Sequence, residues 1–236
     1  SDTWRQLENT AFDAQSSIIP AKVSKTDIAI VAIDEQSFAH YQTSWPWPAG
    51  FYTNLLERLN QAGAKAVVLN LPIDALPNAN EKQASNFANS ITASNLPVYL
   101  AKRQGSQDDS LLNYYRDVGA RIKSFEFSPD LDGVVRCLPH GSNSISYEFS
   151  AQNLTENTRI RFIGDTNSFV TIPFVNAANA NLLPDHIFKD KIVLVGIDIL
   201  ANTRFGDTAI DRYRTPFTWL SGNTMSGVEV HANTIV

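Results

Sequence analysis

Asp34, Asn70 and Asp198 each stand where a short apolar run of this 236-residue chain ends, and Asp207 follows in the next loop. Because the carboxyl ends of parallel strands meet at one edge of a sheet, the first three side chains are expected to converge there. Oxygen donors grouped in this way suit a divalent cation or another polar ligand. The simpler interpretation, which we favour, is that each Asp caps the helix or loop that follows it, since capping is a common use of Asp after a strand.

An enzyme built on these carboxylates would be a metal-dependent hydrolase that uses Asp34, Asp198 and Asp207. The sequence lacks the glycine-rich phosphate loop, the GxSxG nucleophile elbow, the HExxH motif and any paired CxxC. Its four histidines are far apart, and none has a second ligand type at helical spacing. We therefore predict no catalytic residue, no cofactor and no metal site, and keep the hydrolase as an alternative.

Trp45 and Trp47 alternate with Pro46 and Pro48. Prolines favour an extended path, and alternate residues of an extended chain point the same way, so the two indoles are expected on one surface. Such a surface would bind a ligand by stacking or anchor a dimer. The alternative, which we favour, is a rigid corner at the start of the following helix, because large aromatic side chains are usually buried.

Three arginines near the end of the chain, Arg204, Arg212 and Arg214, are close in sequence to Asp207 and Asp211. Guanidinium groups could bind an anion there. Because acidic residues are so near, we expect mutual salt bridges instead.

Three short apolar runs define the elements that must position these residues. Residues 27–34, 66–70 and 191–198 are typical of parallel strands that are buried on both faces. Residues 96–100 are expected to add another parallel strand. Amphipathic spacing predicts the helices 2–17, 51–62 and 81–94, and a further helix over 144–154. The fold class that follows is α/β, a single domain over 1–236 with a largely parallel sheet covered by helices.

Two antiparallel hairpins are expected in addition to this sheet. One would join residues 121–127 to 134–138, and the other would join 159–163 to 169–174 across a Gly-Asp turn. Residues 202–223 lack periodicity and are expected to form a long loop that either carries function or is mobile.

Composition and net charge further limit the classes of function that are possible. The chain is 43% apolar, which is enough for a core, and its net charge of −5 argues against nucleic acid as a partner. One cysteine, Cys137, excludes an intrachain disulfide. No apolar run reaches the roughly 18 residues that cross a bilayer.

Several separated segments, taken together, resemble the type-two CHASE domain (CHASE2), an extracellular sensory domain of bacterial receptors. Residues 27–35, the Trp-Pro-Trp-Pro segment 45–48 and residues 55–68 are similar to its opening. The turn Asp-Gly-Val-Val-Arg at 132–136 and the strand 188–196 are similar to its middle part. Asp207, residues 215–217 and residues 225–233 are similar to its end.

The resemblance implies the extracytoplasmic, periplasmic part of a bacterial inner-membrane receptor. Flanking transmembrane helices would pass its signal to a cytoplasmic histidine kinase, nucleotide cyclase or cyclic-di-GMP enzyme. The domain itself would bind an unknown small-molecule or envelope signal, with Asp34, Trp45, Trp47, Asp198 and Asp207 as the candidate ligand-binding residues. The alternative to sensing is a ligand-free spacer that positions the output domains by dimerisation.

The ends of the chain agree with that arrangement. Residues 1–19 would form one membrane-proximal helix, and residues 227–236 would be the start of a second one. Trp4, Leu7 and Ala11 fall on one face of the first helix and are the candidate dimer or membrane-proximal contacts of a homodimer.

Overall fold

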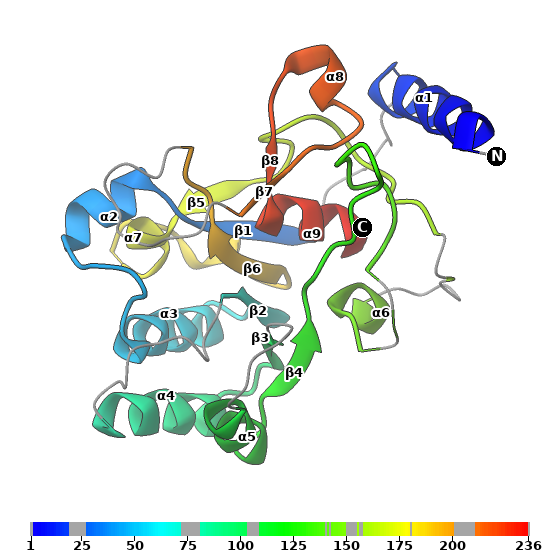
Figure 1. Ribbon diagram of the computed structural model, residues 1–236. Coiled ribbons are helices and arrows are strands. Elements are labelled where there is room, and N and C mark those ends of the chain that lie inside the picture. Colours follow the sequence, from blue (N-terminus) through cyan, green and yellow to red (C-terminus); the bar gives the residue numbers. More distant parts are fainter. Residues whose placement is uncertain are drawn as a thin grey trace.

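The computed structural model describes residues 2–18, 27–71, 81–102, 109–139, 141, 143–149, 155, 158–179, 181–200 and 211–235. Within these ranges the main feature is a six-stranded sheet of order β4-β3-β2-β6-β1-β5 (Figure 1), in which every neighbouring pair is parallel. A separate antiparallel pair is formed by β7 (Arg212–Tyr213) and β8 (Met225–Ser226). The α/β class is thus confirmed.

The three predicted central strands are β1 (Ile28–Ile33), β2 (Ala66–Asn70) and β6 (Ile192–Ile197). The last strand in sequence lies between the other two, with Ala29 of β1 in register with Val193. Every residue of β1 and β6 is buried, as expected for a parallel sheet covered on both faces. The sheet is completed by β3 (Val98–Lys102), β4 (Arg121–Ser124) and β5 (Thr171–Pro173).

Side-chain alternation divides the sheet into two buried faces. Val31, Leu69 and Val193 belong to a core shared with the helices of one face. Those helices are α2 (Glu35–Tyr41), α3 (Ala49–Gln61), α4 (Glu81–Ala93), α5 (Ser110–Asp117) and α7 (Phe174–Ala177). Ile30 and Leu194 belong to the core of the other face, where α6 (Ile145–Phe149) and α9 (Gly227–Ile235) pack.

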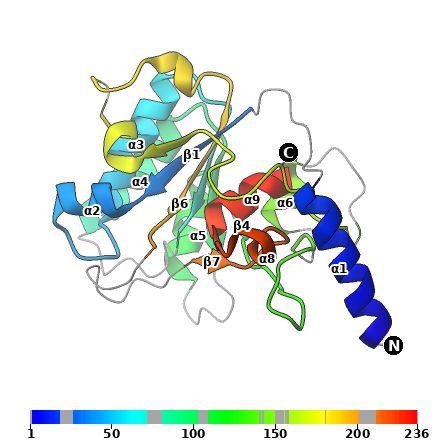
Figure 2. The same cartoon turned by 90° about the horizontal axis from the view of Figure 1, so that it is seen from above.

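The last described helix, α9, lies between the sheet and a third apolar cluster. Val228 and Ala232 pack on the sheet, whereas Val230 packs among residues of irregular segments such as Val135 and Phe162. Seen from above, α9 therefore separates the sheet from the part that carries α8 (Thr218–Ser221) and α1 (Asp2–Ile18) (Figure 2). Burial on both sides explains why all residues from Gly227 to Thr234 are buried.

Two glycines allow α9 to come this close. A Cβ placed on Gly196 of β6 would lie 2.6 Å from the Cβ of Val228, and one on Gly227 would lie 2.2 Å from an Asp211 carboxylate oxygen. Real Cβ atoms essentially never approach another atom so closely. Glycine is therefore required at position 196 by the contact with Val228, whereas a side chain at position 227 would have to displace the Asp211 carboxylate.

The two predicted antiparallel hairpins are wrong, although both turns exist. Residues 121–124 form β4 and pair in parallel with β3, and residues 171–173 form β5 and pair in parallel with β1. Cys137 and Arg159, one from each predicted hairpin, instead form an antiparallel bridge with each other. The sequence shows apolar runs and a turn, but a turn does not reveal whether the chain pairs across it or continues to a distant strand.

The Gly196–Val228 contact gives a testable consequence. Replacing Gly196 with Ala should lower the free energy of unfolding by about 1–3 kcal/mol, because an added methyl group must push α9 away from β6. Gly50→Ala is the matched control: nothing lies within 4 Å of its added Cβ, and Ala favours the helix α3. Urea denaturation measures both, and equal stability of the two variants would contradict the close packing.

Candidate functional site

A polar cleft of about 690 Å³ opens at the carboxyl ends of β1 and β6. We call it the carboxyl-edge cleft; its charged lining residues are Asp34, Glu35, Asp198, Arg212 and Glu229. It lies where β1 continues into α2 on one face of the sheet while α9 covers the other face. Crevices of this kind are where open α/β sheets place their ligands.

Asp34 lines the cleft and also caps α2. One of its carboxylate oxygens accepts hydrogen bonds from the Ser37 backbone N–H (2.9 Å) and from the Ser37 hydroxyl (2.6 Å). The next residue, Glu35, accepts a bond from the backbone N–H of Leu200 (2.8 Å) and so ties α2 to the segment after β6. The capping role expected for Asp34 is therefore confirmed.

Asp198 pairs with Arg212, whose Nη1 lies 2.6 Å from the carboxylate. The same guanidinium donates to the Thr224 hydroxyl from Nε (3.0 Å) and to the Thr224 carbonyl from Nη2. Burial raises the pKa of Asp198; the charge of Arg212 opposes this, and the nearby carboxylates of Glu35 and Asp34 reinforce it. Arg212 thus forms a salt bridge, but its partner Asp198 lies outside the group of nearby acidic residues from which the sequence predicted the partner.

Glu229 reaches the cleft from α9, although only 4% of the residue is exposed. Its carboxylate accepts a hydrogen bond from the backbone N–H of Ser168 (2.9 Å). Burial raises the pKa of Glu229, the backbone hydrogen bonds from Ser168 and Asn167 lower it, and the charge of Asp198 raises it again. Two carboxyl groups in one cleft thus both hold protons more tightly than usual.

Asn70 lies outside the lining of the carboxyl-edge cleft and pairs with Asp211. Its Nδ2 donates to the Asp211 carboxylate (3.3 Å), and burial raises the pKa of that carboxyl. Arg214 is also absent from the lining of the cleft, and it donates to the backbone carbonyl of Asp132 (3.1 Å). Asp207 and Arg204 lie outside the described residues.

The two tryptophans form the corner that the prolines predict. Trp47 is fully buried, donates from Nε1 to the Thr43 carbonyl (3.2 Å), and stacks on Phe51 at the start of α3 with centroids 5.4 Å apart. Trp45 is half-buried and meets Trp47 edge-on at 6.0 Å. Neither indole is among the residues that line the carboxyl-edge cleft. Their role as ligand-binding residues stays a prediction.

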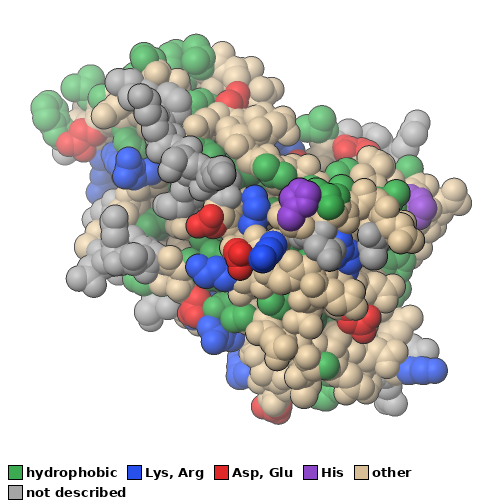
Figure 3. All heavy atoms as spheres, turned by 180° about the vertical axis from the view of Figure 1, so that it is seen from behind, with side chains coloured by type: hydrophobic (Ala, Val, Ile, Leu, Met, Phe, Trp, Pro, Cys, Tyr) green, Lys and Arg blue, Asp and Glu red, His purple; other side chains and the backbone are tan. Residues whose placement is uncertain are grey.

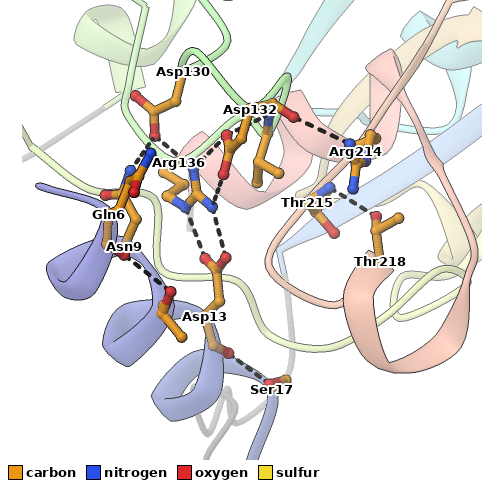
Figure 4. A network of polar contacts seen from close by, with 12 residues as sticks. Gln6, Asn9, Asp13, Ser17, Asp130, Asp132, Arg136, Arg214, Thr215 and Thr218 are labelled. Carbon is orange, nitrogen blue, oxygen red and sulfur yellow. Dashed lines mark hydrogen bonds and ion pairs between the residues drawn. The ribbon is translucent and has the colours of Figure 1, made fainter. Parts of the chain in front are cut away.

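A charge network that sequence reasoning missed is centred on Arg136, which is only 2% exposed (Figure 4). Its guanidinium contacts Asp13 (2.6 and 2.8 Å), Asp130 (2.7 Å) and Asp132 (2.7 and 2.9 Å). The Arg136 hydrogen bond is the main reason that the pKa of Asp132 is lowered. The spacing of Asp132 and Arg136 indicates part of this network, but Asp13 is on α1, 123 residues earlier in the chain than Arg136.

Arg159 provides a second attachment for α1. It donates to the Asn9 side-chain carbonyl (3.0 Å), and its guanidinium carbon lies 4.4 Å from the centre of the Phe12 ring. Asn9 also donates to Asp130 (3.3 Å). The helix α1 is thus held on the molecule mainly by charged and polar contacts.

Polar residues of α9 hold irregular segments of the chain in place by hydrogen bonds to their backbone groups. His231 is fully buried, with Nε2 at 2.9 Å from the Phe125 carbonyl, and burial lowers its pKa to about 3, so the ring is neutral. The Asn233 side chain accepts from the Ile163 backbone N–H (2.9 Å). These contacts give the Glu, His and Asn of the last helix structural partners.

Across the described residues, no group of three or more His, Cys, Asp or Glu side chains is arranged to hold a metal ion. In the same ranges, no helix combines the length and the apolar character needed to cross a bilayer.

The doubly covered parallel sheet, with a polar cleft at its carboxyl edge, defines the class of the chain as an α/β domain. A family model, that of the CHASE2 domain, matches residues 1–236. The chain therefore belongs to the CHASE2 family, which is a family of extracellular sensory domains. Neither the curated proteins nor the solved structures that were compared gave a match.

The raised pKa of Glu229 predicts a specific pH dependence. A carboxyl whose folded pKa exceeds its unfolded value contributes stability that is present in acid and is lost as the pH rises through the folded pKa. Glu229→Gln removes this titration but keeps an oxygen for the Ser168 N–H. From about pH 7 to about pH 5, the melting temperature of the native chain should therefore rise relative to that of the variant.

Comparing the native chain with the Glu229→Gln variant cancels the contributions to pH dependence of groups that titrate in the opposite sense. Asp132 and Glu148, whose pKa values are lowered, are examples. Differential scanning fluorimetry at a series of pH values measures both curves. Parallel curves would show that Glu229 titrates alike in the folded and unfolded chains.

Proposed function

We propose that this chain is the extracytoplasmic sensory module of a bacterial transmembrane receptor. The observation that carries the proposal is the CHASE2 match over residues 1–236. The module lies on the periplasmic side of the inner membrane, and flanking membrane helices pass its signal to a cytoplasmic kinase or nucleotide cyclase. The catalytic step of the receptor belongs to that output domain, and the module itself binds the signal.

The carboxyl-edge cleft is the signal-binding site in this proposal. Its volume of about 690 Å³ lies within the range of roughly 300–1,000 Å³ that is usual for small-molecule sites. Two of the candidate ligand-binding residues, Asp34 and Asp198, line it together, as expected of polar residues at the ends of β1 and β6. Each is fixed by a protein partner, so the site is preformed.

The charge of the cleft narrows the class of ligand. Asp34, Glu35, Asp198 and Glu229 supply carboxylates against the single guanidinium of Arg212 among the lining residues that the structure describes. Such a lining repels polyanions and favours polar molecules that carry amine or hydroxyl groups. A small amine or a hydroxylated envelope fragment therefore fits the site better than a nucleotide or a phosphate ester.

A ligand in this cleft would act directly on α9, the described helix nearest the C-terminus of the chain. Glu229 lines the cleft and belongs to α9, the last element that the structure describes. The ligand shifts the output only by its difference in affinity for two arrangements of the module. We propose that these arrangements differ in how α9 is held against the 166–168 loop, where Glu229 accepts its backbone hydrogen bonds.

A thermal-shift screen tests the proposal. Small amines, sugars and cell-wall fragments are added to the purified chain, and a ligand that binds only the folded state at about 100 times its Kd stabilises it by roughly 2.7 kcal/mol. Asp198→Asn should weaken that ligand at least tenfold, because the substitution removes a cleft charge and the Arg212 pair. Asp190→Asn, which changes an exposed carboxylate outside the cleft lining, should leave the shift unchanged.

Two results would count against the proposal. One is a screen in which no compound raises the melting temperature at millimolar concentration, which would favour the ligand-free spacer. The other is a ligand whose affinity is the same for the native chain and for Asp198→Asn, which would place the binding site elsewhere.

A further inference from the structure

The guanidinium of Arg212 is only partly used by the protein. It makes three hydrogen bonds, one to Asp198 and two to Thr224. A guanidinium has five N–H donors, so two of them remain without a partner among the described residues. The Arg212 side chain is only 10% exposed, and it lines the carboxyl-edge cleft. Because a buried donor without a partner is costly, the molecule that fills the cleft has to supply the acceptors.

Arg136 shows how a guanidinium with a purely structural role differs. It makes five hydrogen bonds, to Asp13, Asp130 and Asp132, so each of its donors is used. A cavity of about 450 Å³ borders Arg136 as well, but the guanidinium has no donor left for a ligand there. Arg136 holds segments of the chain together, whereas Arg212 does this and keeps two donors for the cleft.

The exposed face of α1 lacks groups that would specify a partner. Trp4 and Leu7 are each 62% exposed, and Ala11 is exposed as well. An apolar face fits many partners, because it has no donors or charges that discriminate among them. The role of these residues as dimer or membrane-proximal contacts stays a prediction.

Two carboxylates of the carboxyl-edge cleft are also only partly used. Oδ1 of Asp34 accepts both hydrogen bonds from Ser37, and Oδ1 of Asp198 accepts the bond from Arg212. The Oδ2 atoms of Asp34 and Asp198 have no hydrogen-bond partner among the described residues. The charge of Asp34 raises the pKa of Asp198, which shows that the two carboxylates are close. The cleft therefore presents unused acceptors together with unused donors.

Burial makes the charges of the cleft more effective than those of the open surface. Seen from behind, basic and acidic side chains lie next to one another on an exposed face of the molecule (Figure 3). Water screens such exposed pairs, so they contribute little. In the cleft, the side chains of Arg212 and Asp198 are 10% and 25% exposed, and a charge brought beside them therefore interacts more strongly.

We propose that the carboxyl-edge cleft binds a small zwitterion, a molecule that carries both an ammonium and a carboxylate group, such as an amino acid or a short peptide. The carboxylate of the ligand accepts the two unused N–H groups of Arg212. Its ammonium group donates to the unused oxygens of Asp34 and Asp198. This inference rests on the proposed function, because it names the ligand class of the same site.

Molecules with only one of the two charges fit the cleft less well. An amine alone leaves the two N–H groups of Arg212 unpaired, and an acid alone meets the carboxylates of Asp34 and Asp198. A site built to hydrogen-bond a group strongly rejects an analogue that lacks it. The volume of about 690 Å³ has room for a side chain or a second residue, so free amino acids and short peptides both belong to the class.

Isothermal titration calorimetry on the native chain tests the ligand class. The probes are the common L- and D-amino acids and their dipeptides with glycine. Each compound that binds is compared with the amine that lacks its carboxyl group and with the acid that lacks its amino group. The zwitterion should bind at least tenfold more tightly than either. Free amino acids and dipeptides form separate arms, so their relative affinities identify the source of the zwitterion.

Arg212→Gln assigns the effect to the guanidinium. The substitution should raise the Kd of the zwitterion at least tenfold and should not raise the Kd of the matched amine. Arg116→Gln, at an exposed residue of α5 outside the cleft lining, should change neither. The melting temperature of each variant without ligand shows whether it is folded, and the comparison of probes on the native chain needs no variant.

Several outcomes would overturn the inference. Equal affinity of the zwitterion and its matched amine, or tighter binding of a neutral sugar, would do so while the proposed function stands. An Arg212→Gln variant that binds the zwitterion as tightly as the native chain does would have the same meaning. A panel in which no zwitterion, amine, acid or sugar binds would overturn the inference together with the proposed function.

Discussion

The closeness of α9 to the central strand β6 is the constraint on which the rest of this structure depends. Gly196 and Gly227 leave no room for a side chain, so Val228 rests directly on the sheet and the Asp211 carboxylate fits against the start of the helix. A nine-residue helix is marginal alone. It is stable here because one side packs on the sheet and the other on the cluster around Val135 and Phe162.

The same helix organises segments that have no regular structure of their own. Glu229, His231 and Asn233 each hold a backbone group of another segment, namely those of Ser168, Phe125 and Ile163. Buried polar groups are tolerated when each is hydrogen-bonded, and then they specify one arrangement. One wall of the carboxyl-edge cleft is thus a consequence of how α9 is anchored. The carboxyl-edge cleft and the structural core share Glu229, so under the proposed function a ligand in the cleft acts on the core.

Sequence reasoning succeeded where a local pattern decides the structure. The buried runs at 27–34, 66–70 and 191–198 are strands, and the polar residues at two of their ends, Asp34 and Asp198, do meet at one cleft. It failed where distant pairing decides. The partner of Arg136 on α1 is Asp13, and β5 pairs with β1; neither choice leaves a periodic signal in the chain. The family resemblance extended over nearly the whole chain, but it did not reveal that the polar residues of α9 serve as internal anchors.

Hydrogen-exchange mass spectrometry on the 236-residue chain tests most directly whether α9 is part of the core. Amides that open only with global unfolding exchange most slowly, and a docked element with few apolar contacts opens earlier. The account predicts that peptides from α9 exchange as slowly as those from β1 and β6, and more slowly than those from α1. Exchange of α9 as fast as that of α1, while β6 stays protected, would contradict it.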